Sequence, residues 1–206
     1  MSPMERETKL IISSGDYRRL LETGDVTGCG EQLNVYLHDP TRLRETHGYF
    51  RVRFESEKEP MATLKLPVGW KGEMREMVEV ERPLSELGPD LFPRPRRWVP
   101  VVPNLPGVFR EHFRKLGITR LRRLGWMRNR RCVVHLGPPG TVEVDRTRLP
   151  DGTVHFEVEI EDPSAERHGA LVERVTALAP SARATRVGKF TRFMVAAGIL
   201  DHSETP

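Results

Sequence analysis

Residues 153–161 read Thr153-Val154-His155-Phe156-Glu157-Val158-Glu159-Ile160-Glu161. Successive side chains of a β-strand point to opposite faces of a sheet, so one face of this stretch carries glutamates and the other carries apolar side chains. Residues 141–145 repeat the alternation, and Pro150-Asp151-Gly152 between the two stretches suits a tight reversal. Residues 131–136 form a third alternating stretch, joined to residues 141–145 by the turn at Gly137-Pro138-Pro139-Gly140. The three stretches together predict an antiparallel meander of three strands.

The same alternation recurs elsewhere and predicts about eight strands in all. The further segments are residues 5–12, 34–37, 49–55, 62–66 and 77–81. Helical spacing of apolar residues appears over 16–22, 107–116, 163–178 and 188–197. Since these helices do not alternate regularly with the strands, we expect an α+β fold dominated by an antiparallel sheet, with the helices packed outside it.

One domain over residues 1–200 is the expected organisation, followed by a disordered tail at 201–206. A chain of 206 residues is long enough to bury a core as a single unit. Residues 83–106 are rich in proline and contain Arg94, Arg96 and Arg97, which is typical of an extended connector. We interpret this segment as a connector inside the domain, between an N-terminal and a C-terminal set of strands.

Composition restricts the setting and the partners. The 33 basic and 29 acidic residues give a formal charge of +4, which permits an anionic ligand but is not typical of a nucleic-acid-binding tail. No stretch approaches the roughly 20 apolar residues of a membrane span, and the N-terminus lacks an apolar signal core. Cys29 and Cys132 cannot build a disulfide framework and have no metal-binding spacing with the histidines, so a reducing, cytoplasmic setting is expected.

The charged faces of the predicted strands are the unusual feature. An ordinary sheet also has one apolar face on the core and one polar face in water, and any single strand here fits that interpretation. However, strand after strand carries only ionised groups, whereas solvent faces usually mix in neutral polar residues. If the sheet closes with these faces inward, the acids become oxygen ligands for Mg²⁺ or Mn²⁺ and the bases surround a polyanion. Such a lumen must be wide and wet, because uncompensated buried charges are costly.

The opening motif Glu5-x-Glu7-x-Lys9 resembles the signature of the CYTH family, the triphosphate tunnel metalloenzymes. That family includes inorganic triphosphatases, thiamine triphosphatases and class IV adenylate cyclases. Further motifs follow in the family's order over nearly the whole chain. They are Gln32-x-Asn34-Val35-Tyr36-Leu37, Gly48-Tyr49-Phe50-Arg51-Val52-Arg53, Thr63-Leu64-Lys65, Glu79-x-Glu81, Arg131, Glu143-Val144-Asp145, Glu157-x-Glu159-x-Glu161 and Gly188-Lys189-Phe190.

Residues 124–129 and 144–147 look closest to the plant-like and bacterial tripolyphosphatase branch of this family. There are two departures from the family pattern. His38-Asp39-Pro40 stands where Asp-Thr-Pro is usual, and Gly188 stands where a serine often precedes the late lysine. Neither departure removes a charged group, so the resemblance still implies an active enzyme.

The resemblance implies a closed eight-stranded antiparallel β-barrel that forms a triphosphate tunnel. It also implies that carboxylates hold one or two Mg²⁺ or Mn²⁺ ions, while lysines and arginines grip the triphosphate. The implied metal ligands are Glu5, Glu7, Asp145, Glu157 and Glu159, with Glu79 and Glu81 shaping a second metal site. The implied phosphate-binding and catalytic residues are Lys9, Arg51, Arg53, Lys65, Arg131 and Lys189. Arg128 and Arg130 remain alternatives to Arg131, which best fits the distance to the hairpin.

The implied reaction is metal-dependent hydrolysis of a triphosphate, foremost inorganic triphosphate, to phosphate and a diphosphate product. Water attacks the terminal phosphorus in line, and no covalent intermediate is expected because these motifs contain no nucleophilic serine, cysteine or histidine. Thiamine triphosphate hydrolysis remains an alternative. So does adenylate cyclisation, in which a ribose hydroxyl replaces water, although no adenine-recognition pattern is visible.

Two readings outside catalysis are also open. A polyphosphate or nucleotide sensor would keep the basic residues without turnover, but it would normally lose the metal carboxylates. A nucleic-acid binder would use the arginines between residues 120 and 131, but few aromatic residues are available to stack on bases. The expected partner is therefore a small-molecule triphosphate, with no nucleic acid and no membrane, and the chain is expected to be a monomer or a homodimer.

Overall fold

A computed structural model describes residues 7–39, 48–71, 74–86, 98–100, 105–162 and 164–201. The chain divides into two compact units. The terminal unit contains residues 1–32, 71–74 and 127–206, and the central unit contains residues 33–70 and 75–126. Glu5, residues 87–97 and 101–104 of the predicted connector, and residues 202–206 of the predicted tail lie outside the described residues.

The terminal unit is built on an antiparallel sheet with the strand order β10-β1-β9-β8-β7. These strands are β1 (Glu7–Ile12), β7 (Arg120–His135), β8 (Thr141–Arg148), β9 (Val154–Glu161) and β10 (Arg183–Ala184), and β7 continues from the central unit. The predicted meander is confirmed, because β8 pairs antiparallel with both β7 and β9. Gly137 and Gly152 in the two turns adopt φ of 92° and 88°, a left-handed conformation that favours glycine.

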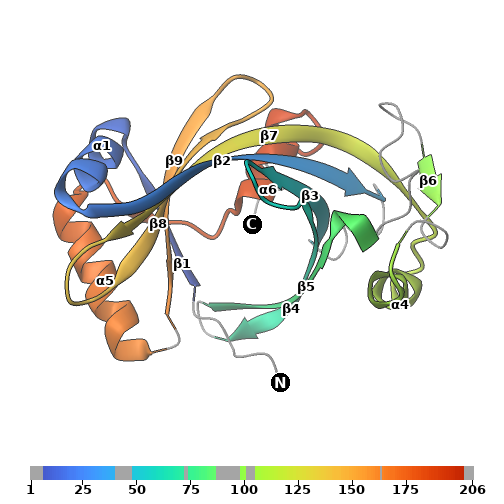
Figure 1. Ribbon diagram of the computed structural model, residues 1–206, viewed down its shortest axis with the longest axis horizontal. Coiled ribbons are helices and arrows are strands. Elements are labelled where there is room, and N and C mark those ends of the chain that lie inside the picture. Colours follow the sequence, from blue (N-terminus) through green and yellow to red (C-terminus); the bar gives the residue numbers. More distant parts are fainter. Residues whose placement is uncertain are drawn as a thin grey trace. The chain divides into compact units, whose positions relative to one another are not determined.

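The helices α1 (Ser14–Thr23) and α5 (Ala165–Leu178) cover the apolar face of this sheet, whereas α6 (Lys189–Ala196) brings Lys189 and Arg192 to the charged face. In α1 the first turn is capped by Ser13, whose hydroxyl accepts from the amide of Asp16, and Ser164 caps α5 in the same way. Figure 1 shows α1 and α5 together on one side of β8 and β9. The core between helices and sheet includes Leu10, Leu20, Val134, Val144, Val158, Ile160, Leu171 and Val175. The charged residues that alternate with these apolar positions therefore point to the opposite face.

The central unit contains a second run of paired strands, in the order β2-β3-β4-β5. They are β2 (Asp25–His38), β3 (Tyr49–Glu55), β4 (Met61–Lys71) and β5 (Met74–Pro83), followed by the short helix η1 (Leu84–Glu86). The first residues of β7 pair with β6 (Trp98–Pro100). Phe109 and Phe113 of α4 (Gly107–Lys115) pack edge-on against Phe50 at ring separations of 5.3 and 5.5 Å. As in the terminal unit, the apolar residues of β3 lie on this core and its arginines alternate with them.

The predicted antiparallel α+β architecture is confirmed. The eight longer strands and the four helices α1, α4, α5 and α6 (Lys189–Ala196) lie at the predicted places, and β6 and β10 are short additions. The predictions were too short for β2 and β7, which include Gly28-Cys29-Gly30 and an arginine-rich stretch without simple alternation. The described strands form one open sheet that runs in order from β10 to β5, so the predicted closed eight-stranded barrel is not confirmed and stays a prediction. Among the described residues, no helix is both long enough and apolar enough to span a bilayer.

Cys29 of β2 and Cys132 of β7 form a disulfide within the terminal unit, with an S–S distance of 2.02 Å. The conclusion from the sequence that these two cysteines cannot build a disulfide framework is thus corrected, because they form one disulfide. A separation of 103 residues conceals that the two strands lie beside each other. The bond also removes the argument from cysteine usage for a reducing compartment, so a cytoplasmic location remains only a prediction.

Candidate metal and phosphate site

The charged face of the terminal unit is assembled by strand register. Glu159 of β9 pairs directly with Lys9 of β1 on one side and with Glu143 of β8 on the other. Asp145 of β8 similarly lies between Glu157 and Arg131. Directly paired residues of an antiparallel sheet point to the same face, so side chains from four strands converge on one place.

Three carboxylates form the buried centre of this face. Asp145, Glu157 and Glu159 are exposed by 0%, 1% and 7% respectively, and each offers an oxygen atom within 4.8 Å of the others. A second group of the same kind consists of Glu7, Glu159 and Glu161 and shares Glu159 with the first. Carboxylate oxygens are the ligands that Mg²⁺ and Mn²⁺ favour, so the donor set fits a hard divalent ion. Glu161 was not predicted as a ligand, although it continues the glutamate alternation of residues 157–161.

Lys189 joins the three buried carboxylates. It is the first residue of α6, and its Nζ lies 2.7 Å from Asp145, 2.5 Å from Glu157 and 2.5 Å from Glu159. Burial alone would lower the pKa of Lys189, but the carboxylates outweigh burial and raise the pKa above its usual range. In return, Lys189 holds the pKa values of Asp145 and Glu159 below their usual range despite burial. Lys189, Asp145 and Glu159 are therefore ionised at neutral pH.

Arg131 holds the same cluster from β7. Its Nε and one terminal nitrogen bind the two oxygens of Asp145 at 2.9 and 2.7 Å, and that nitrogen also lies 2.5 Å from Glu159. A further ion pair reaches Glu143. Arg128 and Arg130 are exposed on the opposite face of the strand, the face of Cys132. Of the three arginines left open by the sequence, Arg131 is the one whose side chain contacts the carboxylates.

Two further cations complete the charges of this face. Lys9 pairs with Glu7 and lies 3.4 Å from Glu159. Arg192, one helical turn after Lys189 in α6, forms an ion pair with Glu157 and donates to the carbonyl oxygen of Val187 at 2.6 Å. Arg192 was not predicted as a site residue. The one signal in the sequence was its spacing of three residues from Lys189, which places both side chains on the same face of a helix.

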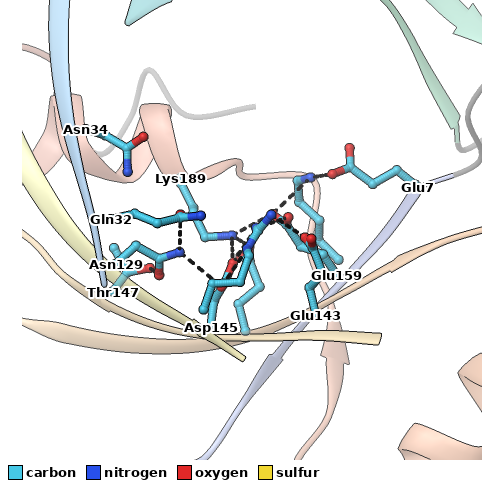
Figure 2. A network of polar contacts seen from close by, with 12 residues as sticks. Glu7, Gln32, Asn34, Asn129, Glu143, Asp145, Thr147, Glu159 and Lys189 are labelled. Carbon is cyan, nitrogen blue, oxygen red and sulfur yellow. Dashed lines mark hydrogen bonds and ion pairs between the residues drawn. The ribbon is translucent and has the colours of Figure 1, made fainter. Parts of the chain in front are cut away.

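A buried network of neutral side chains adjoins Asp145 and was also missed as part of the site. Asn129 of β7 contacts Gln32 of β2, Thr147 of β8 and Asp145 itself. Figure 2 shows these side chains beside Lys189 and Asp145, with dashed lines that connect the amides to the charged cluster. Gln32 belongs to a quoted family motif, and Asn129 and Thr147 end the two stretches that resemble the tripolyphosphatase branch, but no role in the site was predicted for any of the three.

The remaining predicted residues lie in the central unit. Lys65 is 2.7 Å from Glu79, and Arg53 donates to the amide oxygen of Asn34 at 3.3 Å. Burial would lower the pKa of Lys65, but Tyr49 and Glu79 together raise it. Glu81 accepts from the hydroxyl of Thr63 at 2.7 Å. Basic and acidic residues thus alternate on the polar face of β3, β4 and β5 as they do on the terminal unit's sheet.

Arg51 of β3 is the most enclosed of these cations. It is 9% exposed and lies over the ring of Tyr49, 5.6 Å from the ring centre. Within the described parts of the chain, its Nε has no hydrogen-bond partner. A buried guanidinium donor without a partner is unusual and fits a group that receives an anionic ligand.

The structure therefore collects the predicted residues in two sets. The terminal unit gathers Glu7, Lys9, Arg131, Asp145, Glu157, Glu159 and Lys189. The central unit carries Arg51, Arg53, Lys65, Glu79 and Glu81. Each set is consistent with its predicted chemistry, and the roles of the individual residues stay predictions.

Comparison with known proteins gives one family and several similar folds. The family model of the CYTH domain matches residues 3–194. No curated protein matches the sequence. A candidate adenylyl cyclase from Hippeastrum, reported to have a dominant triphosphatase activity, superposes with a TM-score of 0.71 at 19% identity and covers 98% of this chain and 100% of its own. A candidate adenylate cyclase from Bacillus halodurans has a TM-score of 0.66 at 21% identity and covers 93% of this chain and 96% of its own. At such identities these two structures support the fold alone.

Proposed function

The chain belongs to the CYTH family, and from that premise we propose that it hydrolyses inorganic triphosphate to phosphate and diphosphate with the help of Mg²⁺ or Mn²⁺. Enzymes of this family are metal-dependent triphosphate hydrolases. The single observation that carries the proposal is the buried cluster of Asp145, Glu157 and Glu159, held by Lys189 and Arg131. Several ionised groups are not buried together merely for stability, because their desolvation rarely yields a net gain.

In the proposed site, Asp145, Glu157 and Glu159 hold the divalent ion, with Glu7 and Glu161 as the outer group around Glu159. When bound, the ion supplies positive charge that neutralises phosphate oxygens. Arg131, Lys189, Lys9 and Arg192 orient the triphosphate, since arginine offers a fork of donors and lysine a point charge. Positioning and electrostatics then favour in-line attack by water on the terminal phosphorus, the usual basis of phosphoryl transfer.

The cations of the central unit are proposed to bind the same triphosphate. Arg51, Arg53 and Lys65 alternate on the polar faces of β3 and β4, and Arg51 has a donor with no partner among the described residues. By the family resemblance these cations are proposed phosphate ligands, and Glu79 and Glu81 are the candidates for shaping a second metal site.

Hydrolysis is favoured over cyclisation by the Hippeastrum protein, a candidate cyclase in which triphosphatase activity is dominant. A non-catalytic sensor is disfavoured because the described carboxylates of the cluster are all retained. Thiamine triphosphate remains a second candidate substrate. It would present the same triphosphate to the same residues.

The test is phosphate release from inorganic triphosphate, thiamine triphosphate and ATP, each with Mg²⁺, Mn²⁺ or EDTA. An Asp145→Asn variant removes the most buried carboxylate and should lose activity by about 10²–10³-fold, the size seen when one preorganised group is removed. Glu173→Gln, on the exposed side of α5, is the matched control and should keep full activity. Cyclic nucleotide formed from ATP without phosphate release would favour the cyclase, and binding of triphosphate without any turnover would favour the sensor.

A further inference from the structure

Asn129 lies at the centre of a fully used set of hydrogen bonds. Its Nδ2 donates to Oε1 of Gln32 at 3.1 Å and to Oδ1 of Asp145 at 3.0 Å, and its Oδ1 accepts from the hydroxyl of Thr147 at 2.8 Å. Asn129, Thr147, Gln32 and Asp145 are all buried. Polar groups buried in this way are held firmly, because each lost partner leaves an unsatisfied group away from water.

The partners determine which way the amide of Asn129 faces. Both oxygens of Asp145 accept hydrogen bonds from Arg131, so the group of Asn129 that faces Oδ1 is the NH₂. The reversed amide would place a carbonyl oxygen against the carboxylate and leave both acceptors without a proton. Thr147 then completes the arrangement, since its hydroxyl donates to the amide oxygen on the far side.

The two oxygens of Asp145 consequently have different surroundings. Oδ1 receives the Asn129 amide and Nε of Arg131 at 2.9 Å. Oδ2 lies 2.7 Å from Nζ of Lys189, the same nitrogen that touches Glu157 and Glu159. Oδ2 therefore contacts the cation shared with Glu157 and Glu159, whereas Oδ1 accepts from Asn129 and Arg131.

Nothing within Asp145 itself fixes this difference. Rotation about the terminal bond of an aspartate is soft, with broad minima in place of sharp rotamers. Arg131 binds both oxygens and so holds the plane of the carboxylate. Lys189 contacts Oδ2 and Asn129 contacts Oδ1, so Asn129 is the neutral partner that holds the rotation at the oxygen that Lys189 does not contact.

We propose that Asn129, oriented by Thr147 and Gln32, is a positioning residue that presents Oδ2 of Asp145 to the divalent ion. The inference rests on the proposed function, since it concerns the same carboxylate cluster. Asn129 touches neither ion nor substrate in this role and acts only through Asp145. Outer partners of metal ligands orient the ligand and typically change metal affinity by about 10–100-fold when removed.

A purely structural role makes a different prediction from a positioning role. If the network only fills and satisfies the interior, its loss lowers the melting temperature and leaves metal affinity unchanged. If it positions Asp145, metal affinity falls, the Mg²⁺ concentration needed for half-maximal activity rises, and kcat at saturating metal changes little. The measurement must therefore report metal binding separately from turnover.

The experiment is a calorimetric titration of the full chain with Mn²⁺, with the melting temperature recorded for every variant. Asn129→Leu keeps the branched shape but removes both donors and the acceptor, and its Mn²⁺ affinity should fall by about 10–100-fold. Thr147→Val removes the hydroxyl that orients the amide and should weaken Mn²⁺ binding in the same direction. Thr147→Ser keeps the hydroxyl and should restore the wild-type affinity, even if it lowers the melting temperature.

The outcomes separate the two proposals. A wild-type chain that binds no Mn²⁺ and hydrolyses no triphosphate refutes the proposed function. A wild-type chain that binds Mn²⁺, with Asn129→Leu and Thr147→Val binding equally well, overturns the positioning role and leaves a structural one. If Asn129→Leu does not fold, the Thr147 pair decides, because equal affinities for the valine and serine variants also overturn the inference.

Discussion

The ammonium nitrogen of Lys189 lies 2.7 Å from Oδ2 of Asp145, a carboxylate with no exposed surface. The same nitrogen contacts Glu157 and Glu159. One lysine from α6 thus compensates part of the charge of three acids from β8 and β9. The site and the stability of the terminal unit accordingly depend on the same contact.

Lys189→Met should destabilise the chain by about 3–5 kcal/mol, because removing one partner of a buried ion pair leaves uncompensated charge. Mn²⁺ should recover a large part of this loss, since the ion supplies positive charge to the same oxygens. Thermal unfolding with Mn²⁺ and with EDTA checks this. Lys115→Met, which removes an exposed ion pair with Glu111 on α4, is the control. Its melting temperature should stay close to that of the wild type, both with Mn²⁺ and with EDTA. A Lys189→Met chain that melts like the wild type in EDTA would contradict the prediction.

Arg131→Lys should lower kcat by about 10²-fold, because lysine keeps the charge but cannot bind both oxygens of Asp145 as the guanidinium fork does. Arg130→Lys, one residue earlier and exposed on the opposite face, should leave the rate unchanged. Steady-state phosphate release from inorganic triphosphate measures both. If Arg130→Lys lowered kcat and Arg131→Lys did not, the phosphate-binding role would belong to Arg130 and the prediction would be refuted.

The disulfide between Cys29 and Cys132 should stabilise the chain, because it closes a loop of about a hundred residues in the unfolded state. We expect a Cys29→Ser plus Cys132→Ser variant to lose about 2–4 kcal/mol of unfolding free energy. Urea titration with and without a reductant provides the measurement, and the double variant should no longer respond to the reductant. Two titratable thiols in the purified, unreduced protein would show that the bond does not form.

Protonation of Asp16 should make the stability of the folded chain depend on pH in the acidic range. Hydrogen bonds from the side chain and backbone of Ser181, with Arg19 nearby, hold the pKa of Asp16 below its ordinary value of 3.8. A carboxyl group whose pKa is lower in the folded state than in the unfolded state stabilises the fold at any pH above the unfolded-state pKa. This stabilisation is lost as the pH falls through the folded-state pKa. Asp16→Asn should therefore melt at a lower temperature than the wild type at pH 7, and the difference should shrink below pH 3.8. The control Glu173→Gln should melt at the same temperature as the wild type at every pH. If the difference in melting temperature between Asp16→Asn and the wild type stayed constant with pH, the linkage would be refuted.

Much of the fold could be predicted because its signals are local. Alternation over residues 153–161 and the glycine turn at Gly152 are enough to place β9 beside β8, and helix periodicity locates α5. The charged face of Glu157 and Glu159 follows from the same alternation. These elements are set by neighbours in sequence, which a single chain reveals.

The rest depends on register between distant strands. Cys29 and Cys132 are far apart in sequence, and only the adjacency of β2 and β7 brings them together. Asn129 and Thr147 are directly paired across β7 and β8, but a one-residue change of register would place them on other partners. Their part in the site is visible only once the sheet is known.

The contact between Lys189 and Glu157 spans 32 residues of sequence, and this separation has a consequence in time. Ribosomes add about 5–20 residues per second, so the acids of β8 and β9 are synthesised some seconds before the lysine that neutralises them. During that interval Arg131 and Lys9 compensate part of the charge of Asp145 and Glu159, whereas both cationic partners of Glu157 among the described residues belong to α6. Addition of α6 then supplies the charge that balances Glu157, so we expect this part of the sheet to reach its final packing only after the helix has been made.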